Sequence, residues 1–81
     1  MAYAEYEILK TIIVFPAEKD SLWHKELNLI SWRGMMPKYD LRAWTDNHEK
    51  MSKGITLTKE QMEQIAFAFL KDNGYEVKGN G

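Results

Sequence analysis

Cysteine is absent from this 81-residue sequence, so neither a disulfide nor a thiolate metal site can form. The longest apolar run, at 11–15, is far too short for a signal peptide or a membrane span. We therefore expect a cytoplasmic protein that has no membrane association. The two histidines, His24 and His48, are far apart in the sequence and lack the spacing of paired metal ligands. We interpret them as ordinary surface or loop residues, and we predict neither a metal site nor another cofactor.

The shortness of the chain limits its core. A domain of this length buries only about 60–65% of the surface that its unfolded chain exposes. Disulfides, metals and a partner chain are the common remedies. The lack of cysteine removes disulfides and thiolate metal sites, and the histidine spacing does not indicate another metal site. We therefore predict one domain, 1–81, that forms a homodimer and is frayed at residues 1–5 and 78–81.

Excess charge of one sign is also lacking, since the formal net charge is −1. Its distribution is uneven, however. Residues 23–53 carry six basic and four acidic side chains and hold all three tryptophans, whereas both flanking segments are net negative. A polyanion responds to the local field on one face and not to the total charge. The middle segment is therefore a weak indication of a nucleic-acid partner.

Hydrophobic periodicity predicts strands followed by one helix. A Thr58–Gln61 capping box marks the start of the helix, and Asn73–Gly74 marks its end. The fourth strand should be bent at Gly54. The fold class is therefore α+β, a four-stranded antiparallel sheet with a C-terminal helix. The predicted strands are about 6–15, 22–33, 38–45 and 50–57, and the predicted helix is about 59–73.

The third predicted strand divides its side chains between two faces. Tyr39 and Leu41 point to one side, an ordinary core pattern, while Asp40, Arg42 and Trp44 point to the other. A single amphipathic helix can cover only one face of the sheet. We therefore expect the face that holds Arg42 and Trp44 to be exposed and available to a partner.

The aromatic and basic residues of that face suit an unpaired nucleic-acid strand. Trp32 lies on the neighbouring strand and Lys53 on the next one, so indole rings would stack bases while cations contact phosphates. Structural alternatives are that the tryptophans are core or dimer residues and that Arg42 only pairs with Asp40. No nucleophile–base pair or phosphate-binding loop is visible. We therefore predict neither an enzyme nor a small-molecule substrate.

The segments "YDLRAW" and "HEKMSKGITLTKEQMEQI" resemble the signature of the positive cofactor four family of transcriptional coactivators, most closely its bacterial YdbC-type branch. The resemblance implies a curved antiparallel sheet of four strands with a C-terminal helix, swapped or packed as a symmetric homodimer. It also implies binding of single-stranded DNA with low sequence specificity, in support of transcription, replication or repair.

The resemblance also implies roles for particular residues. Trp32 falls where the family has a base-stacking aromatic, and Trp44 takes the position before the family's second stacking tryptophan, where this chain has Thr45. The remaining nucleic-acid-binding candidates are Arg33, Arg42, Lys53 and Lys25. Trp23 and Lys38 are secondary candidates, because Trp23 could equally pack under the first strand and the hairpin before Lys38 is one residue longer than in the family. The helix would form the dimer interface through Ile65, Phe67, Phe69 and Leu70.

Two alternative functions use the same face. One is binding of single-stranded RNA. The other is a protein–protein adaptor whose exposed aromatic residues are hot spots, because Trp and Arg are enriched in such interfaces. The adaptor predicts weak salt dependence and no oligonucleotide binding.

Overall fold

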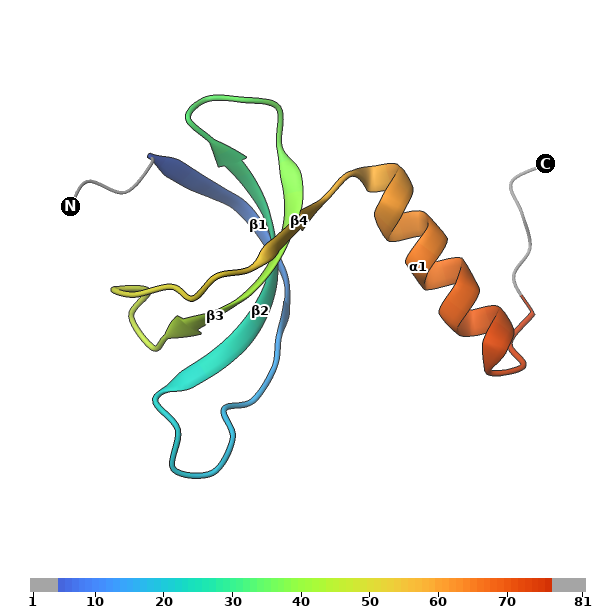
Figure 1. Ribbon diagram of the computed structural model, residues 1–81, viewed down its shortest axis with the longest axis horizontal. Helices are drawn as coiled ribbons and strands as arrows, with labels where there is room; N and C mark the ends of the chain where they lie inside the picture. Colours follow the sequence, from blue (N-terminus) through green and yellow to red (C-terminus); the bar gives the residue numbers. More distant parts are fainter. Residues whose placement is uncertain (1–4, 77–81) are drawn as a thin grey trace.

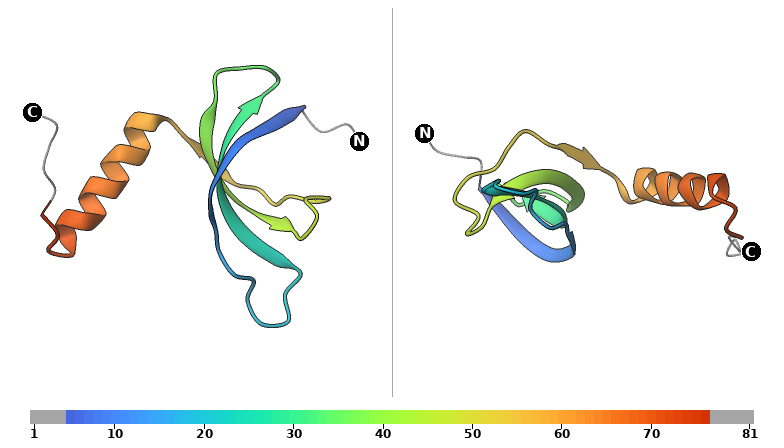
Figure 2. Two further views of the ribbon diagram at one scale, coloured as in Figure 1. Left: turned by 180° about the vertical axis from the view of Figure 1, so that it is seen from behind. Right: turned by 90° about the horizontal axis from the view of Figure 1, so that it is seen from below.

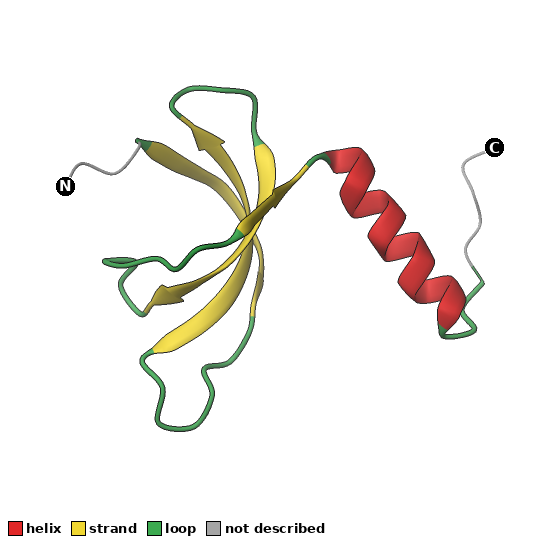
Figure 3. Cartoon of the chain, in the orientation of Figure 1, coloured by secondary structure: helices red, strands yellow, loops and turns green. Residues whose placement is uncertain are grey.

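The computed structural model describes residues 5–76, which form one antiparallel sheet and one helix (Figures 1 and 3). The sheet has the strand order β1-β2-β3-β4, and every neighbouring pair is antiparallel. This confirms the predicted α+β fold class. The predicted frayed ends, apart from residue 5, lie outside the described residues. The elements are β1 Tyr6–Val14, β2 Trp23–Trp32, β3 Lys38–Thr45, β4 Ile55–Leu57 and α1 Lys59–Asp72.

The sheet is strongly curved, and α1 extends away from it on the convex side (Figures 1 and 2). The pairing of β1 with β2 shifts twice, between Ile8 and Lys10 and between Thr11 and Ile13. Such irregularities bend a strand and increase its twist. The curvature therefore has a local cause in β1, which the sequence pattern alone did not indicate.

Strand register sorts the side chains of β2 and β3 onto two faces. Glu26 lies opposite Arg42 and Asn28 opposite Asp40, so these residues share what we call the inner face. It is the concave face, over which the 46–54 loop folds (Figure 1). His48 of this loop contacts Glu26. We call the opposite, convex side the outer face.

The inner face forms the core of the single chain, which reverses the prediction. Trp44 and Asp40 are both 0% exposed, whereas Leu41 of the outer face is only half-buried. The alternation along β3 was predicted correctly, but the assignment of core and exposed faces was wrong. The physical reason is the curvature, which closes the concave side around its own side chains.

The fourth strand is shorter than predicted. Only Ile55–Leu57 pair continuously with β3, and Met51 forms an isolated bridge to Trp44. A Cβ atom at Gly54 would lie 2.4 Å from the Cβ of Arg42 and 2.6 Å from the carbonyl oxygen of Leu41. Glycine is therefore required because the backbone approaches β3 too closely for any side chain.

The helix has the predicted ends but does not cover the sheet. The Gln61 amide donates to Thr58 Oγ1 at 3.1 Å and the Thr58 amide donates to Gln61 Oε1 at 2.9 Å, which completes the capping box. Gly74 follows the helix with a φ of +82°. No residue of α1 is buried, and Phe69 is 62% exposed. The expectation that the helix covers one sheet face within this chain is wrong, and the described helix is too short and too polar to span a membrane.

Candidate nucleic-acid interface

Arg42 is tied into the core by a two-pronged ion pair. Its Nε and Nη2 donate to the two carboxylate oxygens of Asp40, each at 2.6 Å, and its Nη1 donates to the Ser52 carbonyl at 3.3 Å. The Arg42 side chain is only 13% exposed and that of Asp40 is 0% exposed. The expectation of an exposed Arg42 is therefore wrong, because the curved sheet encloses its side chain. The alternative that Arg42 pairs with Asp40 is confirmed, and the pair is buried.

Trp32 lies on this anchored guanidinium. The Arg42 Cζ is 4.8 Å from the centroid of the Trp32 ring, a cation–π distance, and the Tyr6 ring is 5.5 Å away. Trp32 remains half-buried, so part of its surface is accessible. Arg42 thus fixes the position of the aromatic that was predicted to stack a base.

A pocket of about 160 Å³ opens beside Trp32, and it combines apolar side chains with one cation. Its flexible thioethers, Met35 and Met36, are 63% and 84% exposed. These methionines were not predicted from the sequence to be site residues. Their position in the sequence could have indicated this role, because two large apolar residues in the connection of a hairpin cannot be buried in the core. The lining residues are Trp32, Met35, Met36, Lys38 and Thr56.

Three basic residues that were predicted to bind nucleic acid are exposed around the end of the inner face that holds Trp32. Lys38 lines the pocket, and Arg33 follows Trp32 in the turn with a φ of +51°. Lys53 directly precedes Gly54, where the chain crosses Arg42. None of the three takes part in an ion pair within residues 5–76. Their charges are therefore available to a polyanion.

The other predicted residues lie elsewhere. Trp23 pairs with Thr45 and Lys25 with Ala43, so the register places both on the outer face, opposite to Trp32. Both are exposed and border a separate pocket of about 310 Å³. The eight candidate side chains thus do not form one continuous surface.

Trp44 has no accessible ring face. It is 0% exposed and packs against Tyr6, whose ring centroid is 5.6 Å away, and against His48, at 4.6 Å. The prediction that Trp44 is exposed is wrong. Its indole closes the core across the concave side, and in this conformation no base can reach it.

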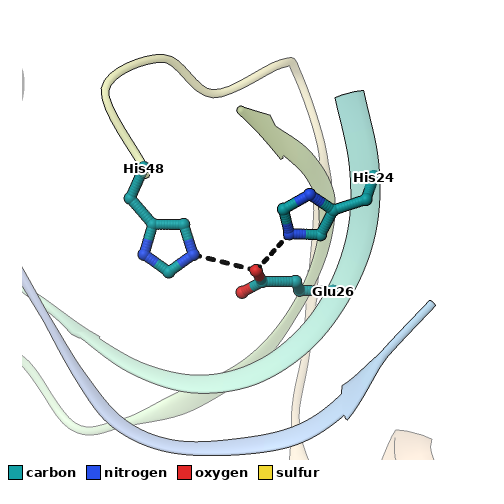
Figure 4. Close-up of side chains that lie close together, drawn as sticks. All are labelled: His24, Glu26 and His48. Carbon is teal, nitrogen blue, oxygen red and sulfur yellow. Dashed lines mark hydrogen bonds and ion pairs between the residues drawn. The ribbon is translucent and has the colours of Figure 1, made fainter. Parts of the chain in front are cut away.

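His24 and His48 are not the unrelated surface histidines that were expected. Both contact the buried carboxylate of Glu26 (Figure 4). This carboxylate also accepts a hydrogen bond from Asn28. Burial by itself would raise the pKa of Glu26. The hydrogen bonds from His48, Asn28 and His24 outweigh this effect and hold its pKa below the ordinary value. The spacing of His24 and Glu26, two residues apart in a strand, could have indicated a shared face.

Comparison with known proteins gives a family match over most of the sheet and part of the helix. The family model for "Transcriptional Coactivator p15 (PC4)" matches residues 19–66, more than half of the chain. This range spans β2, β3, β4 and the first part of α1. An uncharacterized protein of Treponema pallidum (strain Nichols) is 50% identical over 40 residues, which are 49% of this chain and 47% of that protein. The match therefore spans about half the length of this relative.

Proposed function

Because the chain belongs to the transcriptional coactivator p15 (PC4) family, we propose that it binds single-stranded DNA with low sequence specificity. Its roles would be coactivator-like ones in transcription, or in replication or repair, in the cytoplasm of a bacterial cell. The function is binding and not catalysis.

The observation that carries this proposal is the pocket beside Trp32, with exposed cations around it. Stacking of a base on an aromatic ring tolerates any sequence and contributes about 1–3 kcal/mol per base. Arg33, Lys38 and Lys53 would neutralise phosphates and release counterions. A duplex hides the faces of its bases, so this surface should prefer unpaired strands.

The candidate residues then fall into three groups. Trp32, Arg33, Lys38 and Lys53 would contact the strand. Arg42 would hold Trp32 in place, and Trp44 would support the inner face from within the core. Trp23 and Lys25, on the outer face, would form a second contact region.

A homodimer would cover the apolar surfaces that the single chain leaves open. Ile55 of the outer face is 55% exposed, and Ile65, Phe67 and Phe69 of α1 are 52%, 50% and 62% exposed. Because α1 extends away from its own sheet, a second copy could pack against both surfaces (Figure 2). We propose that Ile65, Phe67, Phe69 and Leu70 form this contact.

Fluorescence anisotropy with labelled oligonucleotides tests the proposed function. We expect tight binding to oligo-dT, weaker binding at higher salt, and much weaker binding to a matched duplex. Oligo-rU of the same length separates DNA from RNA binding, since tighter binding to RNA would replace DNA as the proposed ligand. Equal affinity for single strand and duplex, or no binding to either, would contradict the proposal.

A further inference from the structure

Three potential ligand side chains converge on the inner face, at the end of the sheet far from the β2–β3 connection. His24 and Glu26 alternate along β2, and His48 is brought to them by the turn after β3 (Figure 4). His48 has a φ of +60°, a left-handed conformation that costs free energy for a residue with a side chain. The loop thus adopts an unfavourable backbone conformation at the residue that reaches Glu26.

The distances suit a single cation. The Nε2 atoms of His24 and His48 lie 2.5 Å and 2.8 Å from Oε2 of Glu26, and the three residues each offer a ligand atom within 4.8 Å of those of the other two. Zinc lies about 2.0–2.2 Å from nitrogen and oxygen ligands, so ligand atoms around one ion are roughly 3.3 Å apart. Shifts of about 1 Å or less would convert this cluster into a coordination shell.

Polar groups lie on the outer sides of two of the three side chains. The carboxylate of Asp46 lies 3.7 Å from Nδ1 of His24, and Asn28 donates to Oε1 of Glu26 at 3.0 Å. Metal-bound histidines commonly donate their second ring N–H to a carboxylate, which fixes the ring orientation. The side chains of Glu26 and His24 are 5% and 10% exposed, whereas that of His48 is 35% exposed and leaves a route from solvent.

We propose that His24, Glu26 and His48 bind one divalent transition-metal cation, with Zn²⁺ as the representative ion. Two imidazoles and one carboxylate are a known zinc ligand set that leaves a fourth position for water. Calcium and magnesium prefer oxygen ligands throughout and fit this site poorly. The bound ion would join β2 to the 46–50 turn. This proposal does not depend on nucleic-acid binding.

Calorimetric titration of the full chain, without an affinity tag and after treatment with EDTA, tests the site with ZnCl₂ alone. We expect one Zn²⁺ per chain and a higher Tm in its presence. Because the sequence has only these two histidines, His48→Gln and His24→Gln each remove half of its imidazoles. Each substitution should weaken Zn²⁺ binding by at least about 100-fold. Removing a residue that only supports a metal ligand typically costs about 10–100-fold, and removing a ligand should cost more.

Glu49→Gln is the matched control, because it changes a neighbouring exposed carboxylate outside the cluster and should leave the affinity unchanged. Titration with Co²⁺ adds a readout of geometry, since visible absorption bands of a four-coordinate ion should appear in the wild type and vanish in both histidine variants. Circular dichroism establishes that each variant is folded. If the wild type binds no Zn²⁺, or if both folded histidine variants bind it as tightly, the proposal is overturned.

Discussion

At the residue scale, the contacts of Trp32 explain why this tryptophan is suited to stack a base. Its ring contacts the Arg42 guanidinium and the Tyr6 ring, and part of its surface lines a pocket together with Lys38. A fixed ring loses little conformational freedom when a base stacks on it, which favours binding. Arg42, by contrast, is neutralised by Asp40 and contributes through Trp32.

Replacing Trp32 tests this role. Trp32→Ala should weaken binding of oligo-dT by about 1–3 kcal/mol, the contribution of one base stack. Trp32→Phe keeps a ring and should retain most of the affinity. Anisotropy titrations of both variants measure the difference. An unchanged affinity in a folded Trp32→Ala protein would remove Trp32 from the interface.

Lys53 should act through its charge. Lys53→Ala removes one proposed phosphate contact, so the slope of log K against log salt should become shallower by about 1. Lys71→Ala, in the last turn of α1, is the control, because it removes the same charge away from the pocket. The slopes come from titrations at several salt concentrations. A slope identical to that of the wild type would assign Lys53 to solvent.

Glu26 should make stability depend on pH. Its pKa lies below the ordinary value of 4.5, so its ionised form stabilises the folded chain above that pH, and this contribution is lost as pH falls through the lowered pKa. In EDTA, the difference in unfolding free energy between the wild type and Glu26→Gln should shrink below about pH 4.5. Urea unfolding at a series of pH values measures it. A difference that does not change with pH would contradict this interpretation.

At the element scale, the crossing of residues 52–54 over β3 controls the shape of the inner face. Gly54→Ala would place a methyl group against Arg42 and Leu41, so the segment would have to shift. We expect a loss of about 1–3 kcal/mol of stability, measured by thermal or urea unfolding. Gly34→Ala is an informative comparison, because no atom lies within 4 Å of its added Cβ and only its positive φ opposes the change. Equal stability of Gly54→Ala and the wild type would contradict a close contact between Gly54 and β3.

Local sequence patterns predicted β2, β3 and α1 well. Alternation gave the two faces of β2 and β3, and the Thr58–Gln61 spacing gave the start of α1. The family resemblance implied a curved sheet, but local patterns could not show it, because the pairing of β1 with β2 is irregular at two places. For this reason Trp44 was expected outside and is inside. The meeting of His48 with Glu26 was missed for a related reason, since it depends on how the loop folds back over the sheet.

At the scale of the whole molecule, α1 stands away from its own sheet and leaves apolar side chains exposed, which the proposed dimer would cover. Phe69→Glu would place a charge in the middle of the proposed dimer contact, where burial of an unpaired carboxylate is costly. We expect this variant to be monomeric under conditions where the wild type is dimeric, measured by sedimentation equilibrium. Gln64→Glu changes an exposed polar residue of α1 that is not among the proposed contact residues, and this variant should remain dimeric. A monomeric wild type would contradict the proposed dimer.

Binding of a single strand beside Trp32 is tested most directly by the three indole N–H resonances in ¹H–¹⁵N NMR spectra as oligo-dT is added. We expect the largest shift for Trp32, a smaller one for Trp23, and little change for the buried Trp44. A response dominated by Trp23, with Trp32 unaffected, would place the binding surface on the outer face and contradict binding beside Trp32.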